Sequence, residues 1–187
     1  MGRIDKLAER YQRFIALPWR KDLPGAQRIL FLVYDKIDER RLRARKMRFE
    51  LATRESDRHW TECDLTATFA KWMAGQEYKE SYFASPEDLE IKLEDDFLNY
   101  VAQQMRERLA QADEETVVAV FGIASLFGLV RVSDIMSQVE RDIKGRLAVF
   151  FPGEYEDNNY RLLDARDGWN YMAVPITVHE DHGEYDV

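Results

Sequence analysis

Residues 146–176 read RLAVFFPGEYEDNNYRLLDARDGWNYMAVPI, and this stretch decides most of the fold. Its beginning, LAVFF, is continuously apolar, which is typical of a central strand covered on both faces. Proline cannot donate a ladder hydrogen bond and glycine tolerates a tight turn, so Pro152 and Gly153 predict the end of that strand. Two short strands should follow, over residues 160–163 and 171–176, joined as a hairpin by Asp-Ala-Arg-Asp-Gly.

Three other segments are predicted to be strands. Residues 29–34 (ILFLVY) and 116–121 (TVVAVF) are apolar enough for the centre of a sheet, and residues 60–64 form a shorter strand. Helical periodicity or capping residues predict helices between the strands, over residues 38–54, 65–73 and 133–143, the last capped by Ser133, and an N-terminal helix that stops before Pro18. The segment 78–83, YKESYF, is expected to be a loop, either exposed as a partner site or folded back on the core.

The best-marked helix begins at Ser85, with serine at the N-cap, Pro86 at the first helical position and acids in the first turn. Its apolar residues recur every four positions, so one face should lie on a sheet. They are Leu89, Leu93, Phe97, Val101, Met105 and Leu109.

This alternation of strands and helices predicts an α/β fold. We expect a single three-layer domain over residues 1–176, with a mainly parallel central sheet, helices on both faces and a C-terminal antiparallel hairpin at one edge. Pro175 fits an edge strand. Residues 177–187 form an acidic tail that is expected to fray.

Composition narrows the class of protein. A chain of 187 residues with 45% hydrophobic residues supports one domain with a substantial core. The N-terminus has no secretory apolar region, and the longest charge-free run, residues 116–130, is too short to span a membrane. We therefore expect a soluble, cytoplasmic protein. Its net charge of −8 argues against strong direct binding to nucleic acid.

The charges are unevenly distributed. Residues 39–54 contain seven basic and two acidic residues, whereas residues 87–96 contain six carboxylates and one lysine. Helical spacing places Arg41, Arg45 and Arg48 on one face. That face is either solvated, a contact for a partner with an acidic surface, or a modest phosphate contact inside a larger complex.

Ligands of doubly wound sheets bind outside the carboxyl ends of the strands, so a catalytic or binding site should lie among the residues there. Neither G-x-x-x-x-G-K-[ST] nor G-x-G-x-x-G is present. Asp35 and Asp64 are the only plausible carboxylate pair, although helix capping explains both. The turn at residues 122–125 either offers N–H groups to an anion or is small so that helix and strand pack closely.

The remaining candidate groups suggest no cofactor and no metal. Cys63, the single cysteine, is expected to be a small buried hydrophobe in a strand. His179 and His182 lie in the acidic tail, where a solvated tail explains them better than a metal site.

The motifs of the C-terminal part resemble a known family. FFPGEYE, then NNYRL, then WNY, together with residues 117–135 (VVAVFGIASLFGLVRVSDI), resemble the BrxB family of bacteriophage exclusion (BREX) defence systems over roughly the last seventy residues. The turn at residues 122–125 is poorer in glycine than the family's, so a phosphate-holding role does not carry over to it.

The resemblance implies a component of a phage-defence complex whose partners are other BREX proteins, with the alkaline-phosphatase-like PglZ protein as the first candidate. We expect this role to be non-enzymatic, with partner contacts at Arg41, Arg45 and Arg48 and at Gly153, Glu154 and Tyr155. Core packing is the alternative for the turn at Gly153. The alternative function is a nucleotide- or metal-dependent enzyme, or a nucleotide-binding subunit, with its site at the strand ends. A homo-oligomer is left open.

Overall fold

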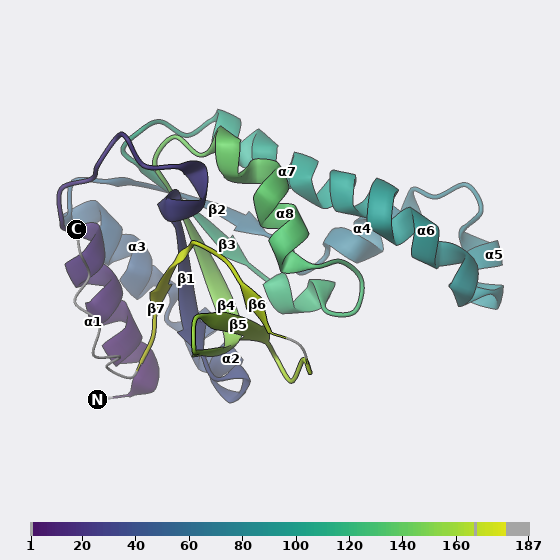
Figure 1. Ribbon diagram of the computed structural model, residues 1–187, viewed down its shortest axis with the longest axis horizontal. Coiled ribbons are helices and arrows are strands. Elements are labelled where there is room, and N and C mark those ends of the chain that lie inside the picture. Colours follow the sequence, from purple (N-terminus) through teal and green to yellow (C-terminus); the bar gives the residue numbers. More distant parts are fainter. Residues whose placement is uncertain (1, 167, 179–187) are drawn as a thin grey trace.

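A parallel sheet forms the centre of the protein, as the computed structural model of residues 2–166 and 168–178 shows (Figure 1). Its strands run in the order β2-β3-β4-β1-β7, and every neighbouring pair is parallel. They are β1 Ile29–Tyr34, β2 His59–Asp64, β3 Thr116–Phe121, β4 Arg146–Glu156 and β7 Val174–Ile176. The predicted α/β class with a mainly parallel central sheet is confirmed.

The apolar segments predicted as central strands are the buried ones. Every residue of β1 and β3 is buried, and so are the first seven residues of β4. Alternate side chains of β1 enter the two separate apolar clusters that lie on opposite faces of the sheet. Because both faces are covered, these strands need no alternation of polar and apolar residues.

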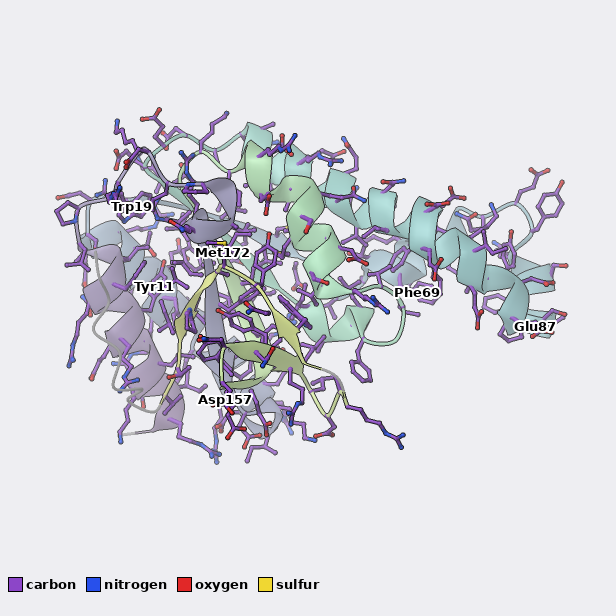
Figure 2. The ribbon with its side chains drawn as sticks, viewed as in Figure 1. Tyr11, Trp19, Phe69, Glu87, Asp157 and Met172 are labelled. Carbon is purple, nitrogen blue, oxygen red and sulfur yellow. The ribbon has the colours of Figure 1, made fainter. Side chains whose placement is uncertain are left out.

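Helices α1 (Arg3–Ile15) and α3 (Lys46–Glu55) cover the first face of the sheet (Figure 1). Tyr11 of α1 points toward the sheet (Figure 2), where its ring lies 5.6 Å from that of Phe49. Its hydroxyl shares a hydrogen bond of 2.6 Å with the hydroxyl of Thr53, which satisfies both buried groups. The N-terminal helix ends at Ile15, before Pro18, as predicted.

Helices α7 (Leu98–Ala110) and α8 (Val132–Val139) cover the second face. The apolar row from Leu89 to Leu109 is buried throughout, as predicted. The helix that carries it is less regular than expected, because it starts as a 3-10 turn, η3 (Pro86–Leu89), and contains a π-helical turn, η4 (Leu93–Phe97). Ser85 occupies the N-cap position without a side-chain capping bond.

The other helices are short. They are α2 Glu39–Ala44, α4 Thr68–Ala74, α5 Lys79–Ala84 and α6 Glu90–Lys92, with the 3-10 turns η1 Gly25–Arg28, η2 Lys36–Asp38, η5 Ile123–Leu126 and η6 Glu140–Asp142.

Three local predictions were wrong. The helix expected over residues 38–54 divides at Arg45, whose φ of −115° and ψ of 11° are not helical. The segment 78–83, expected to be a loop, forms most of α5. Ser133 does not cap α8, because it lies inside the helix and Arg131 holds the N-cap position.

The predicted end of β4 at Pro152 was also wrong. Pro152 pairs with the last residue of β1, beyond the last pair between β4 and β3, so its missing N–H leaves the interior of the sheet intact. The strand continues to Glu156, and the chain turns at Asp157 and Asn158, whose positive φ values of 49° and 61° suit a two-residue hairpin loop.

The antiparallel C-terminal strands are confirmed, although they pair differently from the prediction. Strand β5 (Asn159–Leu162) pairs with the end of β4, and the short β6 (Trp169–Asn170) pairs with β5. Strand β7, which was expected to pair with residues 160–163, lies parallel to β1 instead and places Pro175 at the edge of the sheet as predicted.

Candidate functional site

A cleft opens where the paths of two neighbouring strands separate. After β1 the chain turns toward α2 and the first face, whereas after β4 it enters the β5–β6 hairpin, whose Tyr160 packs in the apolar cluster of the second face. Neighbouring strands whose continuations diverge in this way leave a crevice at their carboxyl ends, where open α/β sheets bind ligands. The crevice has a volume of about 430 Å³.

One wall of the cleft is built by η2 and the start of α1. The carboxylate of Asp35 accepts a hydrogen bond of 3.0 Å from the amide of Ile37, so Asp35 caps η2. Asp38 is 1% exposed and lies between two guanidiniums, with Arg41 Nη1 2.9 Å from Oδ1 and Arg3 Nε 2.8 Å from Oδ2. A buried carboxylate needs such partners to stay ionised.

The opposite wall contains Gly153, Glu154 and Tyr155, together with Asp164. Lys36 Nζ forms an ion pair with Asp164 across the cleft. The Tyr155 hydroxyl donates to Asn158 Oδ1 over 3.0 Å. The structure therefore brings Asp35 together with the segment 153–155, as the rule for strand ends indicates.

Two of the predicted arginines hold α1 against the start of α3. Arg45 Nη1 lies 3.0 Å from Asp5 Oδ2, and Arg48 forms an ion pair with the other oxygen of the same carboxylate. Arg41 turns instead to Asp38. The three side chains keep exposed fractions of 72%, 44% and 55% for Arg41, Arg45 and Arg48, so all of them remain accessible to a partner.

Replacing Asp5 with asparagine should make the protein more sensitive to unfolding at neutral pH. Burial of Asp5 raises its pKa, but the amide of Gly2 and the guanidiniums of Arg45 and Arg48 outweigh it, so the pKa lies below the ordinary 3.8. A lowered carboxyl pKa stabilises the fold above the ordinary value, and this contribution disappears as the pH falls through the folded-state pKa. Urea midpoints should differ between wild type and Asp5→Asn at pH 7, and the difference should shrink as the pH falls below the ordinary value of 3.8. A constant difference across that range would contradict the ion pair.

Arg43, which the sequence analysis did not single out, connects three elements at the carboxyl edge of the sheet. Its guanidinium lies 2.8 Å from Glu39 and 3.0 Å from Asp64, and it donates to the Thr66 hydroxyl over 2.8 Å. The spacing of four residues between Glu39 and Arg43 was a visible signal for the first of these contacts.

Asp35 and Asp64 do not form the carboxylate pair considered from the sequence. Strands β1 and β2 are separated by β3 and β4, so the two side chains belong to different parts of the edge. Asp64 accepts from the amide of Thr66 over 3.0 Å, in the turn before α4. The helix predicted over residues 65–73 begins only at Thr68, with Ala67 at its N-cap and no side-chain capping bond, so the predicted capping of this helix by Asp64 was wrong. Burial raises the pKa of Asp64, but Thr66 and Arg43 outweigh this effect and the pKa is lowered.

The turn after β3 is small because it packs closely. Gly122 has a φ of +79°, and a Cβ atom there would lie 2.5 Å from the amide nitrogen of Thr66. This contact favours the packing interpretation of residues 122–125 over an anion site.

Cys63 is buried in β2, as predicted, and burial raises the pKa of its thiol to about 11. Within residues 2–166 and 168–178, no three His, Cys, Asp or Glu side chains gather into a group that could hold a metal ion. His179 and His182 lie outside the described residues. No helix in the described part of the chain combines the length and apolar character that a membrane span requires.

Two exposed surfaces carry large apolar side chains. Ile37 on η2 and Met47 and Leu51 on α3 have exposed fractions of 67%, 64% and 51%. Helices α4, α5 and α6 project away from the sheet (Figure 1), and Glu87 lies near the far end of this projection (Figure 2). Tyr78, Phe83 and Ile91 are exposed there by 65%, 66% and 79%. Of the two alternatives for the segment 78–83, exposure or packing on the core, two of its three aromatic side chains therefore show exposure.

The fold and the cleft define a three-layer α/β protein with a parallel sheet and a crevice at its switch point. The family model of the BREX protein BrxB matches residues 65–176, which is more than half of the chain. The chain therefore belongs to the BrxB family and is a component of a BREX phage-defence system. No match was found among curated proteins or among solved structures.

The region that the BrxB family model matches contains only some of the candidate partner-binding residues. Gly153, Glu154 and Tyr155 lie inside it, whereas Arg41, Arg45 and Arg48 precede it. The region begins at the end of β2 and contains the helices of the second face, the C-terminal strands and one wall of the cleft.

Proposed function

We propose that the chain is a non-enzymatic interaction component of a cytoplasmic BREX complex, with PglZ as its first candidate partner. The observation that carries this proposal is the segment 37–51, in which Ile37, Met47 and Leu51 are exposed and exposed arginines such as Arg40 and Arg41 lie between them in the sequence. Exposed apolar side chains bordered by charge are typical of protein interfaces. The resemblance to BrxB supplies the choice of PglZ.

Arg41 links the first group of proposed contact residues to the second. It binds Asp38, and Asp38 lines the same cleft as Gly153, Glu154 and Tyr155. We expect a partner that contacts Arg41 to reach the rim of the cleft as well. The arginines would steer an acidic partner and the apolar side chains would supply buried area.

Exchanging Arg40 for glutamate and Arg41 for glutamine should weaken binding to PglZ by roughly tenfold or more and reduce its salt dependence. Arg45 and Arg48 are left unchanged because they bind Asp5 and join α1 to α3. Arg41 takes glutamine because a glutamate there would face the buried carboxylate of Asp38, whereas glutamine can still donate a hydrogen bond to it. Titration calorimetry with purified PglZ at two salt concentrations measures both effects.

Lys71→Glu is the matched control, since Lys71 is an exposed cation on α4. It should bind PglZ like the wild type. Equal affinity of the Arg40 and Arg41 double variant and the wild type would return this surface to a solvated helix face. Light scattering of the free chain tests whether it also forms a homo-oligomer.

The second candidate function is a nucleotide- or metal-dependent site at the strand ends. It is favoured by the position of the cleft at the switch point and by the buried carboxylate of Asp38. Thermal shifts with nucleotides and divalent metals measure binding there. Hydrolysis that is abolished by Asp35→Asn would replace the non-enzymatic proposal with this one.

A further inference from the structure

A cluster of cations lies at the amino ends of the strands, on the opposite edge of the sheet from the cleft. Arg28 directly precedes β1, Arg58 directly precedes β2, and Arg146 is the first residue of β4. Parallel strands begin at the same edge of a sheet, so the three side chains line one cavity. Figure 2 shows Trp19 at this edge and Asp157 near the opposite one.

The cavity has an excess of positive charge that the carboxylates lining it do not balance. Four further cations line it, namely Arg20, Lys21, Arg141 and Lys144. Among the described residues, the carboxylates that line it are Glu114, which is 2.7 Å from Lys21, and Glu115, which forms an ion pair with Arg58. Asp22, outside the lining, pairs with Arg20. Seven cations and these three carboxylates leave a charge of +4 within the described residues, in a protein whose net charge is −8.

Arg146 is the most buried of these cations, with an exposed fraction of 6%. Its guanidinium donates to the carbonyl oxygens of Gly145 over 3.0 Å and of Arg20 over 3.4 Å, and neither acceptor carries a full charge. Burial and the charges of Arg28 and Arg58 lower the pKa of Arg146 to about 10. A buried guanidinium without a counter-charge is costly, and a bound anion would remove that cost.

The surrounding groups hold the guanidiniums in place. The indole of Trp19 lies 4.4 Å from the guanidinium carbon of Arg58 and 4.8 Å from that of Arg146. Arg28 donates to the carbonyls of Lys21, Leu23 and Ile143, over 2.9, 3.1 and 2.7 Å. These contacts explain how the side chains are oriented, but the carbonyl dipoles do not neutralise the charges of Arg28 and Arg146.

We propose that this cavity binds a phosphate group. Guanidiniums offer paired donors that match the oxygens of phosphate, and the multiple negative charge of phosphate suits a site with several cations. The cavity volume is about 220 Å³. Pockets for drug-sized ligands measure about 300–1,000 Å³, so this one fits a single phosphate group better than a whole nucleotide.

Titration calorimetry on the full chain tests the proposal with two sources of the same chemistry. The probes are inorganic phosphate and a short single-stranded oligonucleotide with a 5′-phosphate, with sodium chloride of equal ionic strength and the 5′-hydroxyl oligonucleotide as references. Wild type should bind a phosphate probe, and Arg146→Gln should weaken this binding by roughly tenfold or more.

Arg141→Gln combined with Lys144→Gln is the second variant, for use if Arg146→Gln does not fold. Both residues are exposed, so their replacement should leave the fold intact. It should weaken phosphate binding by roughly threefold or more. Arg40→Gln, an exposed arginine at the other edge of the sheet, should leave binding unchanged.

The outcomes separate the sources and the alternatives. Preference for the 5′-phosphorylated oligonucleotide over inorganic phosphate identifies a nucleic-acid end, and equal affinity identifies free phosphate. Absence of binding, equal binding of the two oligonucleotides, or binding that the cavity variants leave intact would overturn the proposal.

Discussion

Replacing Gly153 with valine should destabilise the protein by about 3 kcal/mol, near the upper end of the cost of overpacking a core. A Cβ atom at this position would lie 2.1 Å from the carbonyl oxygen of Arg161 and 2.8 Å from the ring of Phe151. The first obstacle is backbone of the paired strand β5, which cannot move without breaking the hairpin. Urea denaturation followed by circular dichroism measures the loss.

The cause of this effect differs from the one that the sequence suggested. A Pro-Gly pair predicts a tight turn with positive φ, whereas the glycines with positive φ in the described residues are Gly122 and Gly128. At Gly153 the requirement is the close approach of two strands. Gly128→Ala is therefore the matched control, since its φ is +76° and no atom would lie within 4 Å of the added Cβ. It should cost about 1 kcal/mol through backbone strain alone. A urea midpoint of Gly153→Val equal to that of wild type would disprove the contact.

The sequence predicted the structure best where the residues of a single segment determine its secondary structure. Strands β1 and β3 begin and end at the predicted residues, because a run of six residues buried on both faces leaves an unbroken apolar stretch. The strand-end rule placed Asp35 at the carboxyl edge of the sheet, where the structure shows that it shares one cleft with the segment 153–155.

Contacts between distant segments were not predictable in the same way. The ion pairs of Asp5 with Arg45 and Arg48 join residues about forty positions apart, and local spacing shows only that the arginines share a face. The break of the helix at Arg45 carries no glycine or proline signal. Arg3 enters the cleft because α1 lies beside β1, which no pattern within α1 indicates.

The cluster of cations at the amino ends of the strands has a signal in the sequence. An arginine stands at the very start of three strands, at positions 28, 58 and 146. Each of them looks like an ordinary surface charge when it is considered alone. Only the parallel arrangement of the strands brings them together, so the signal becomes visible once the strand order is known.

Replacing Phe31 with alanine should cost about 3–5 kcal/mol, the usual range for removing a fully buried phenylalanine. Phe31 lies at the centre of β1, and its ring contacts four aromatic rings of the C-terminal segment. The centroid distances are 5.3 Å to Phe151, 4.6 Å to Tyr160, 5.6 Å to Trp169 and 6.5 Å to Tyr171. Domains are stable by about 5–15 kcal/mol, so this one change removes a large part of the total.

Phe83→Ala is the control for this variant, because it deletes the same atoms from a side chain that is 66% exposed. It should change the free energy of unfolding by no more than about 0.5 kcal/mol. Tyr160→Phe gives an intermediate case, since it removes the hydroxyl that donates over 2.8 Å to the carbonyl of Ala173, and it should cost about 1–2 kcal/mol. Urea denaturation ranks the three variants, and hydrogen exchange of the amides of β5 reports on the hairpin itself. A cost for Phe31→Ala as small as that for Phe83→Ala would mean that the hairpin does not rest on β1. The wall of the cleft that carries Gly153, Glu154 and Tyr155 would then lack its anchor, because β5 pairs with those three residues.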